Sequence, residues 1–112
     1  MSQITTHVLD ISAGKPGNDI GVSLMGEINN EWQTIAQGVT NADGRISDLL
    51  PDEKTLSAGV YKIIFNTGEY YKIQKIKTFY PAVEILFTVF DDTHYHVPLL
   101  ISPFGYSTYR GS

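Results

Sequence analysis

Three histidines are the residues of this sequence best suited to proton transfer, because the imidazole pKa lies near neutral pH. They are His7, His94 and His96. In an extended strand, side-chain alternation places His7 on the same face as Leu9 and opposite Val8. A histidine with apolar neighbours is either a hydrogen-bonded core or interface residue or a general base. The pattern alone leaves both interpretations open.

His94 and His96 are two positions apart, so in a strand both side chains lie on one face. Together with a third histidine they could form a zinc site with one position open for water, as in zinc hydrolases. The sequence contains no cysteine, which excludes a thiolate zinc site and a thiol nucleophile. Histidine pairs of this spacing are also common on exposed strands without any function, so the zinc and surface interpretations both remain.

Arg45 follows an expected turn at residues 41–44. Its guanidinium could bind a carbonyl oxygen or a flat anionic ring, although an arginine at a turn exit is often only solvated. Residues 109–112 follow directly after an expected strand. A chain terminus is usually frayed and functionless, but this one is unusually rich in hydrogen-bond donors.

The length and charge of the chain limit the functions to consider. With 112 residues, we expect residues 1–112 to form a single domain. The net charge is −4 and the eight lysines and arginines are scattered, so we expect no nucleic-acid partner. The sequence has neither a bilayer-spanning apolar run nor a basic segment followed by an apolar one at its start. We therefore expect a soluble, cytoplasmic protein without a membrane partner.

The elements that must position these residues are mostly strands, because aromatic and β-branched residues alternate with short turn-forming segments. The expected strands cover residues 4–11, 22–28, 31–39, 60–66, 83–90, 94–101 and 106–109. The expected turns cover residues 14–18, 41–44 and 91–93, and residues 29–30 form a hairpin tip. Residues 94–101 are expected to return antiparallel after residues 83–90.

One short helix is expected within residues 67–77, where Tyr70, Ile73 and Ile76 recur at three-residue spacing. About eight strands with short links and one helix predict an all-β fold. The expected architecture is a sandwich of two sheets.

Four segments of the chain carry motifs of one known family. They are Thr6-His7-Val8-Leu9-Asp10, Gly44-Arg45, residues 94–103 (HYHVPLLISP) and residues 105–112 (GYSTYRGS). With these motifs the whole chain resembles the 5-hydroxyisourate hydrolases of the transthyretin-related family. The closing Tyr-Arg-Gly-Ser is the hallmark of that family. Transthyretin itself shares the pattern of residues 102–108 but lacks the closing tetrapeptide and a histidine at position 96.

This resemblance implies a transthyretin-like (prealbumin-like) sandwich of two four-stranded sheets with one short helix. It implies a homotetramer, a dimer of dimers, with sites in a channel where the dimers meet. The implied reaction is hydrolysis of 5-hydroxyisourate to 2-oxo-4-hydroxy-4-carboxy-5-ureidoimidazoline, a step of urate degradation in purine catabolism, without a metal or cofactor. The alternative is a transthyretin-like protein that binds a small ligand in the same channel.

The resemblance also assigns residues to the site. The implied catalytic residues are His7, Arg45, His96 and Ser112. The implied substrate-binding residues are His7, Arg45, Tyr109, Arg110 and Gly111. In this assignment the two histidines activate water and move protons, and the arginine stabilises an oxyanion. His94 is not a catalytic position of the family, so the resemblance removes the second ligand of the zinc interpretation.

Overall fold

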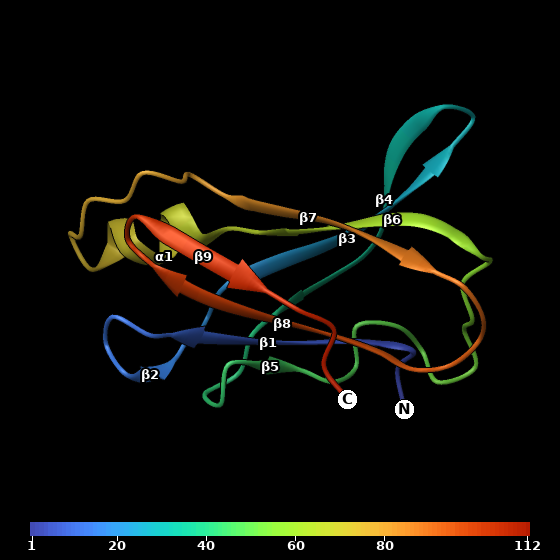
Figure 1. The fold of residues 1–112 in the computed structure, drawn as a ribbon, viewed down its shortest axis with the longest axis horizontal. Coiled ribbons are helices and arrows are strands. Elements are labelled where there is room, and N and C mark those ends of the chain that lie inside the picture. Colours follow the sequence, from blue (N-terminus) through green and yellow to red (C-terminus); the bar gives the residue numbers. More distant parts are fainter.

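The computed structural model describes residues 1–112 as a sandwich of two β-sheets with one short helix at one end (Figure 1). The strands are β1 (Ile4–Asp10), β2 (Lys15–Pro16), β3 (Gly21–Ile28), β4 (Glu31–Val39), β5 (Arg45–Ile46), β6 (Gly59–Phe65), β7 (Val83–Val89), β8 (Tyr95–Ser102) and β9 (Gly105–Thr108). The helix is α1 (Thr67–Ile73). The expected all-β sandwich with one short helix is confirmed.

The first sheet has the strand order β2-β1-β8-β9, with β5 also paired to β1. β1 and β8 run parallel, and β9 returns antiparallel to β8. The short strands β2 and β5 pair side by side with the outer edge of β1. There the carbonyl of Val8 accepts a hydrogen bond from the N–H of Gly17, and its N–H donates to the carbonyl of Gly44. These two short strands give the sheet five strands, where the resemblance implied four.

The second sheet is antiparallel, with the order β4-β3-β6-β7. Its β3–β4 hairpin turns at Asn29 and Asn30, which have φ values of 54° and 65°. Asparagine tolerates this left-handed conformation better than most residues do. The hairpin predicted at residues 29–30 is therefore confirmed.

The expectation that residues 94–101 return antiparallel against residues 83–90 is wrong. β7 pairs with β6 in the second sheet, whereas β8 lies between β1 and β9 in the first sheet. The connection crosses between the sheets, and the Tyr95 hydroxyl secures it by accepting hydrogen bonds from the N–H groups of Phe90 and Asp91. Each strand buries one apolar face in the common core. Both strands can do so whether they pair as a hairpin or lie in different sheets.

The helix ends at Ile73, before the outer limit expected at residue 77. Lys75 has a φ of 60°, and its N–H donates to the carbonyl of Lys72. The N–H of Ile76 donates to the carbonyl of Tyr71. This pair of bonds is a Schellman motif, which satisfies the last helical carbonyls and stops the helix.

The core lies between the two sheets and contains 19 buried apolar residues. Alternate residues of β1, among them Ile4 and Val8, contribute to it. At the end of β1 the buried carboxylate of Asp10 accepts hydrogen bonds from the hydroxyls of Tyr70 and Tyr71, at 2.9 and 3.3 Å. β1 is thus tied to α1 on one side and to the core along its length, while its other face points outward.

Candidate active site

The outer face of the first sheet gathers the predicted site residues. Neighbouring residues that are paired across a sheet point to the same face. β1 pairs His7 with Arg45 of β5 and Thr5 with His96 of β8. Three residues from distant parts of the sequence, His7, Arg45 and His96, therefore share one face.

The turn that ends at Gly44 fixes Arg45 opposite His7. The side-chain oxygen of Asn41 accepts a hydrogen bond from the N–H of Arg45 at 3.0 Å. Gly44 has a φ of 75°, and its carbonyl accepts a hydrogen bond of 2.7 Å from the N–H of Val8. A β-carbon on Gly44 would lie 2.3 Å from the Val8 carbonyl oxygen. Only glycine lets the turn pack this closely against β1.

The surroundings keep the two site histidines neutral. Burial lowers the pKa of His7 below its ordinary value of 6.5, and the positive charge of Arg45 lowers it further. Burial and Arg45 lower the pKa of His96 in the same way, followed by smaller effects of His7 and His94. A neutral imidazole has a free ring nitrogen that can accept a proton. Both residues can therefore act as bases near neutral pH.

Thr5 joins the two histidines that stand two residues apart. Its buried hydroxyl oxygen is 2.8 Å from Nε2 of His94 and 2.8 Å from Nδ1 of His96. The two imidazole rings have centroids 6.4 Å apart. Sequence reasoning did not single out Thr5, although alternation along β1 puts it on the face of His7.

The end of the chain returns to His96. The N–H of Gly111 donates to the carbonyl of His96 at 2.9 Å. A β-carbon on Gly111 would lie 2.6 Å from Cδ2 of His96, so glycine lets the backbone lie against the imidazole. Ser112 then lines a cavity of about 230 Å³ together with Arg45 and His96.

We call this space the histidine cavity, and we define it by Thr5, Arg45, His94, His96 and Ser112. His7 is not part of its wall and lies beside it, opposite Arg45 in the ladder. The structure thus brings together four implied catalytic residues, three of them in the cavity wall.

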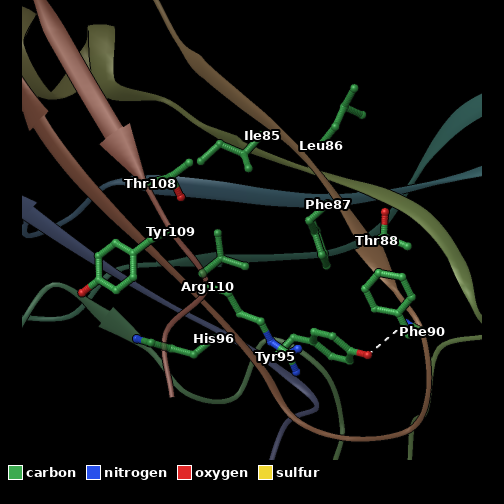
Figure 2. A pocket seen from close by; sticks show the side chains of 11 residues that line it. Ile85, Leu86, Phe87, Thr88, Phe90, Tyr95, His96, Thr108, Tyr109 and Arg110 are labelled. Atoms are coloured by element: carbon green, nitrogen blue, oxygen red, sulfur yellow. Dashed lines mark hydrogen bonds between the residues drawn. The ribbon is translucent and has the colours of Figure 1, made fainter.

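Tyr109 and Arg110 are not in the wall of the histidine cavity. Both line a second cavity of about 410 Å³, which opens between β7 and β8 (Figure 2). The guanidinium carbon of Arg110 is 4.3 Å from the centre of the Tyr95 ring, and one of its nitrogens is 3.5 Å from the carbonyl oxygen of His94. Tyr109 is 61% exposed. His96 lines both cavities, whereas Ser112 is the only residue of the tail in the wall of the histidine cavity.

No set of three histidine, cysteine, aspartate or glutamate side chains comes close enough together to hold a metal ion. The three histidines therefore do not form the ligand set that the zinc interpretation requires. No helix of the structure combines the length and the apolar character needed to cross a membrane.

Known proteins resemble this chain in sequence and in fold. The profile of the HIUase/Transthyretin family matches residues 4–111. The 5-hydroxyisourate hydrolase of Ralstonia nicotianae is 44% identical over 117 aligned residues, which cover 100% of both chains. The structure of Klebsiella pneumoniae 5-hydroxyisourate hydrolase has a TM-score of 0.85 and 38% identity, covering 97% of this chain and 98% of that one. Sea bream transthyretin in complex with thyroxine has a TM-score of 0.91 and 30% identity, covering 98% and 95%.

Proposed function

Because the chain belongs to the HIUase/Transthyretin family, we propose that it hydrolyses 5-hydroxyisourate to 2-oxo-4-hydroxy-4-carboxy-5-ureidoimidazoline, a step of urate degradation in purine catabolism. A hydrolase of that substrate that is 44% identical over the full length supports this function. The observation that carries the proposal is the grouping of His7, Arg45 and His96 on one sheet face. Two neutral imidazoles beside a guanidinium suit the hydrolysis of an amide.

Binding of a small ligand without chemistry is the alternative function, because thyroxine-bound sea bream transthyretin shares this fold. The fold does not separate the two functions, since the Klebsiella pneumoniae hydrolase shares it as well. The polar residues do separate them. A carrier needs no pair of bases with lowered pKa values beside an arginine, whereas hydrolysis uses both.

The first step of the proposed reaction is attack of water on a carbonyl carbon of the substrate ring. His96 accepts one proton of the water as the water oxygen bonds to that carbon, and His7 assists the proton transfer. The electron pair of the C=O double bond moves to its oxygen. Arg45 stabilises this oxyanion, and Ser112 orients the water or the imidazole.

In the second step the carbonyl bond re-forms and the ring C–N bond breaks. The departing nitrogen takes the proton that His96 held, which restores the neutral imidazole. The ring is then open, and the former carbonyl carbon carries a carboxyl group. No metal or cofactor is needed in this scheme, because every proton has a donor and an acceptor among these residues, water and substrate.

We further propose that residues 1–112 form a single cytoplasmic domain that assembles as a homotetramer, a dimer of dimers. The histidine cavity holds about 230 Å³, which is below the roughly 300 Å³ at which small-molecule sites usually begin. A second copy of the chain facing this sheet would enlarge and close it. In that assembly Tyr109, Arg110 and Gly111 contribute to substrate binding.

The decisive experiment follows the ultraviolet absorbance of freshly generated 5-hydroxyisourate with and without the protein. We expect faster decay with the protein, also after dialysis against a strong chelator. Arg45→Ala and His96→Ala should each lower the rate by ~10²-fold or more while the protein stays folded. Lys77→Ala, an exposed residue after the helix, serves as the control. Decay at the spontaneous rate with the wild-type protein, or activity restored only by zinc, would refute the proposal.

A further inference from the structure

We propose that Thr5 is a positioning residue: it links His94 to His96 and so holds His96 in the tautomer with its ring proton on Nδ1. This inference rests on the proposed hydrolysis, since it explains how His96 presents an unprotonated Nε2 to water. It adds a role for Thr5 and His94, to which neither the implied site assignment nor the proposed mechanism gives a function.

The Thr5 hydroxyl has a fixed position. Thr5 is 7% exposed and belongs to β1, where it lies directly opposite His96 in the parallel ladder. Its oxygen is equally far, 2.8 Å, from Nε2 of His94 and from Nδ1 of His96. Both distances are those of good hydrogen bonds.

The single hydroxyl proton of Thr5 can be donated to only one of the two rings. A hydroxyl donates one hydrogen bond and accepts others, while each nitrogen of a neutral imidazole is either a donor or an acceptor. One arrangement runs from Nδ1–H of His96 to the Thr5 oxygen and from the Thr5 hydroxyl to Nε2 of His94. The reverse arrangement runs from Nε2–H of His94 through Thr5 to Nδ1 of His96. The two rings therefore take complementary roles.

The role of His96 as a base selects between these arrangements. In the first, Nε2 of His96 carries no proton, and it can accept one without disturbing the Nδ1–H bond to Thr5. In the reverse arrangement Nε2 of His96 already carries its proton, so accepting another would require every bond of the chain to turn around. Only the first arrangement suits a base that gains and releases a proton in each cycle.

The opposite edge of the His96 ring is held as well. The backbone of Gly111 packs against Cδ2 of His96 so closely that a β-carbon there would lie at 2.6 Å. A half-turn of the ring would exchange Cδ2 and Nδ1, which would break the bond to Thr5 and put a ring nitrogen against the glycine. Thr5 and Gly111 together fix which nitrogen faces the reaction.

The test uses three threonine variants and one histidine variant of the full chain. Thr5→Val removes the hydroxyl at nearly constant volume, and Thr5→Ser retains it. Thr6→Val is the matched control for loss of a buried hydroxyl, because Thr6 is 1% exposed on the same strand and its hydroxyl donates to the carbonyl of Val97 at 2.7 Å. His94→Ala removes the far end of the link.

The main readout is NMR that correlates ring protons with ring nitrogens and so reports the His96 tautomer without any substrate. We expect Nδ1–H of His96 in the wild type, in Thr5→Ser and in Thr6→Val. We expect Thr5→Val and His94→Ala to shift His96 toward Nε2–H. Loss of a carboxylate that fixes a histidine tautomer lowers kcat about 10⁴-fold. Loss of a neutral hydroxyl should have a smaller effect, so we expect kcat of Thr5→Val to fall ~10-fold with little change in KM.

The outcomes separate this inference from the proposed function. A wild-type protein that does not accelerate decay of 5-hydroxyisourate refutes the function, while the tautomer spectra still report on Thr5. An active wild type with Nε2–H on His96 overturns the positioning role. So does a Thr5→Val variant that keeps the wild-type tautomer or kcat, a Thr5→Ser variant that fails to keep them, or a His94→Ala variant whose His96 tautomer is unchanged.

Discussion

Gly111 is the residue of the tail that lies against the Cδ2 edge of His96. We predict that Gly111→Ala lowers turnover at least ~10-fold, because the added methyl group must displace the imidazole or the tail and misplacement of about 1 Å costs up to ~10²-fold. Gly105→Ala is the matched control from the same end of the chain. A β-carbon there meets only Ser102 Oγ, at an ordinary 3.6 Å.

Steady-state kinetics of both glycine variants, with circular dichroism to monitor folding, measure this effect. Equal turnover in both would mean that the tail is only a signature of the family. The functional assignment would then depend on His7, Arg45 and His96.

The protonation of His7 and His96 gives a second prediction at the scale of single residues. Burial and Arg45 lower both pKa values below 6.5. NMR titration of the ring protons should therefore give midpoints below 6.5, and Arg45→Gln should raise both because one of the two main causes is removed. Midpoints at or above 6.5 in the wild type would contradict the neutral pair of bases.

The same shifts fix the sign of the pH dependence of stability. Because the folded-state pKa values are lowered, the unfolded chain binds more protons between the folded pKa and 6.5. The contribution of the two histidines to the free energy of unfolding therefore falls as the pH drops below 6.5. It is lost once the pH is below their folded-state pKa values. Chemical denaturation at several pH values, compared between the wild type and His7→Gln, measures it.

At the scale of elements, the turn before β5 decides where Arg45 points. Gly44→Ala should both unfold more easily and lose most activity. A residue with a β-carbon loses about 1 to 2 kcal/mol of stability at a left-handed φ of 75°. The Val8 carbonyl oxygen also occupies the space that the β-carbon needs. Gly14 offers the matched control. Its φ is 64°, but nothing lies within 4 Å of an added β-carbon.

Gly14→Ala should lose about 1 kcal/mol of stability and keep its turnover. Denaturant unfolding and the decay assay compare the two variants. If Gly44→Ala kept wild-type turnover per folded molecule, the turn would not be what positions the guanidinium.

The elements also show how far the sequence determines the fold. Local signals were sufficient for the hairpin at Asn29 and Asn30 and for the inward and outward faces of β1, since alternation and turn residues act over a few positions. They were insufficient for the partner of β8. A strand with one apolar face suits either a hairpin or a crossing, and only the packing of the whole core decides between them.

The same distinction between local signals and long-range contacts applies to the candidate site. His7, Arg45 and His96 could be found because their residue types and family motifs mark them. Thr5 could not, because a threonine in a strand carries no signal of its own and its partner His96 is 91 positions away. Tyr109 and Arg110 line one cavity and Ser112 lines another. This arrangement likewise depends on contacts that the spacing of residues in the sequence does not predict.

At the scale of the whole molecule, β7 and β9 are edge strands of the two sheets and stay unpaired on one side. Such edges tend to pair with another chain, and closed symmetric oligomers are the usual result. We predict a tetramer, so light scattering should give four times the 12.4 kDa mass of one chain. Leu86→Lys should weaken assembly, because it puts a charge on β7 at an apolar side chain that is 64% exposed.

Ile28→Lys is the control for assembly. Ile28 is 48% exposed and ends β3 at the tip of the β3–β4 hairpin. That tip projects from the sandwich and belongs to neither β7 nor β9 (Figure 1). A fully active monomer would remove the tetramer and the shared channel from the proposal.

The parallel pairing of β1 with β8 also has a consequence for the order of folding. It joins Ile4–Asp10 to residues near the other end of the chain, whereas the β3–β4 hairpin joins neighbours. Closing so long a loop costs entropy before any contact compensates for it, so such pairs form late. We therefore expect the face that carries His7, Arg45 and His96 to form near the end of folding. We then expect a partly folded chain with an ordered second sheet to lack the candidate site entirely.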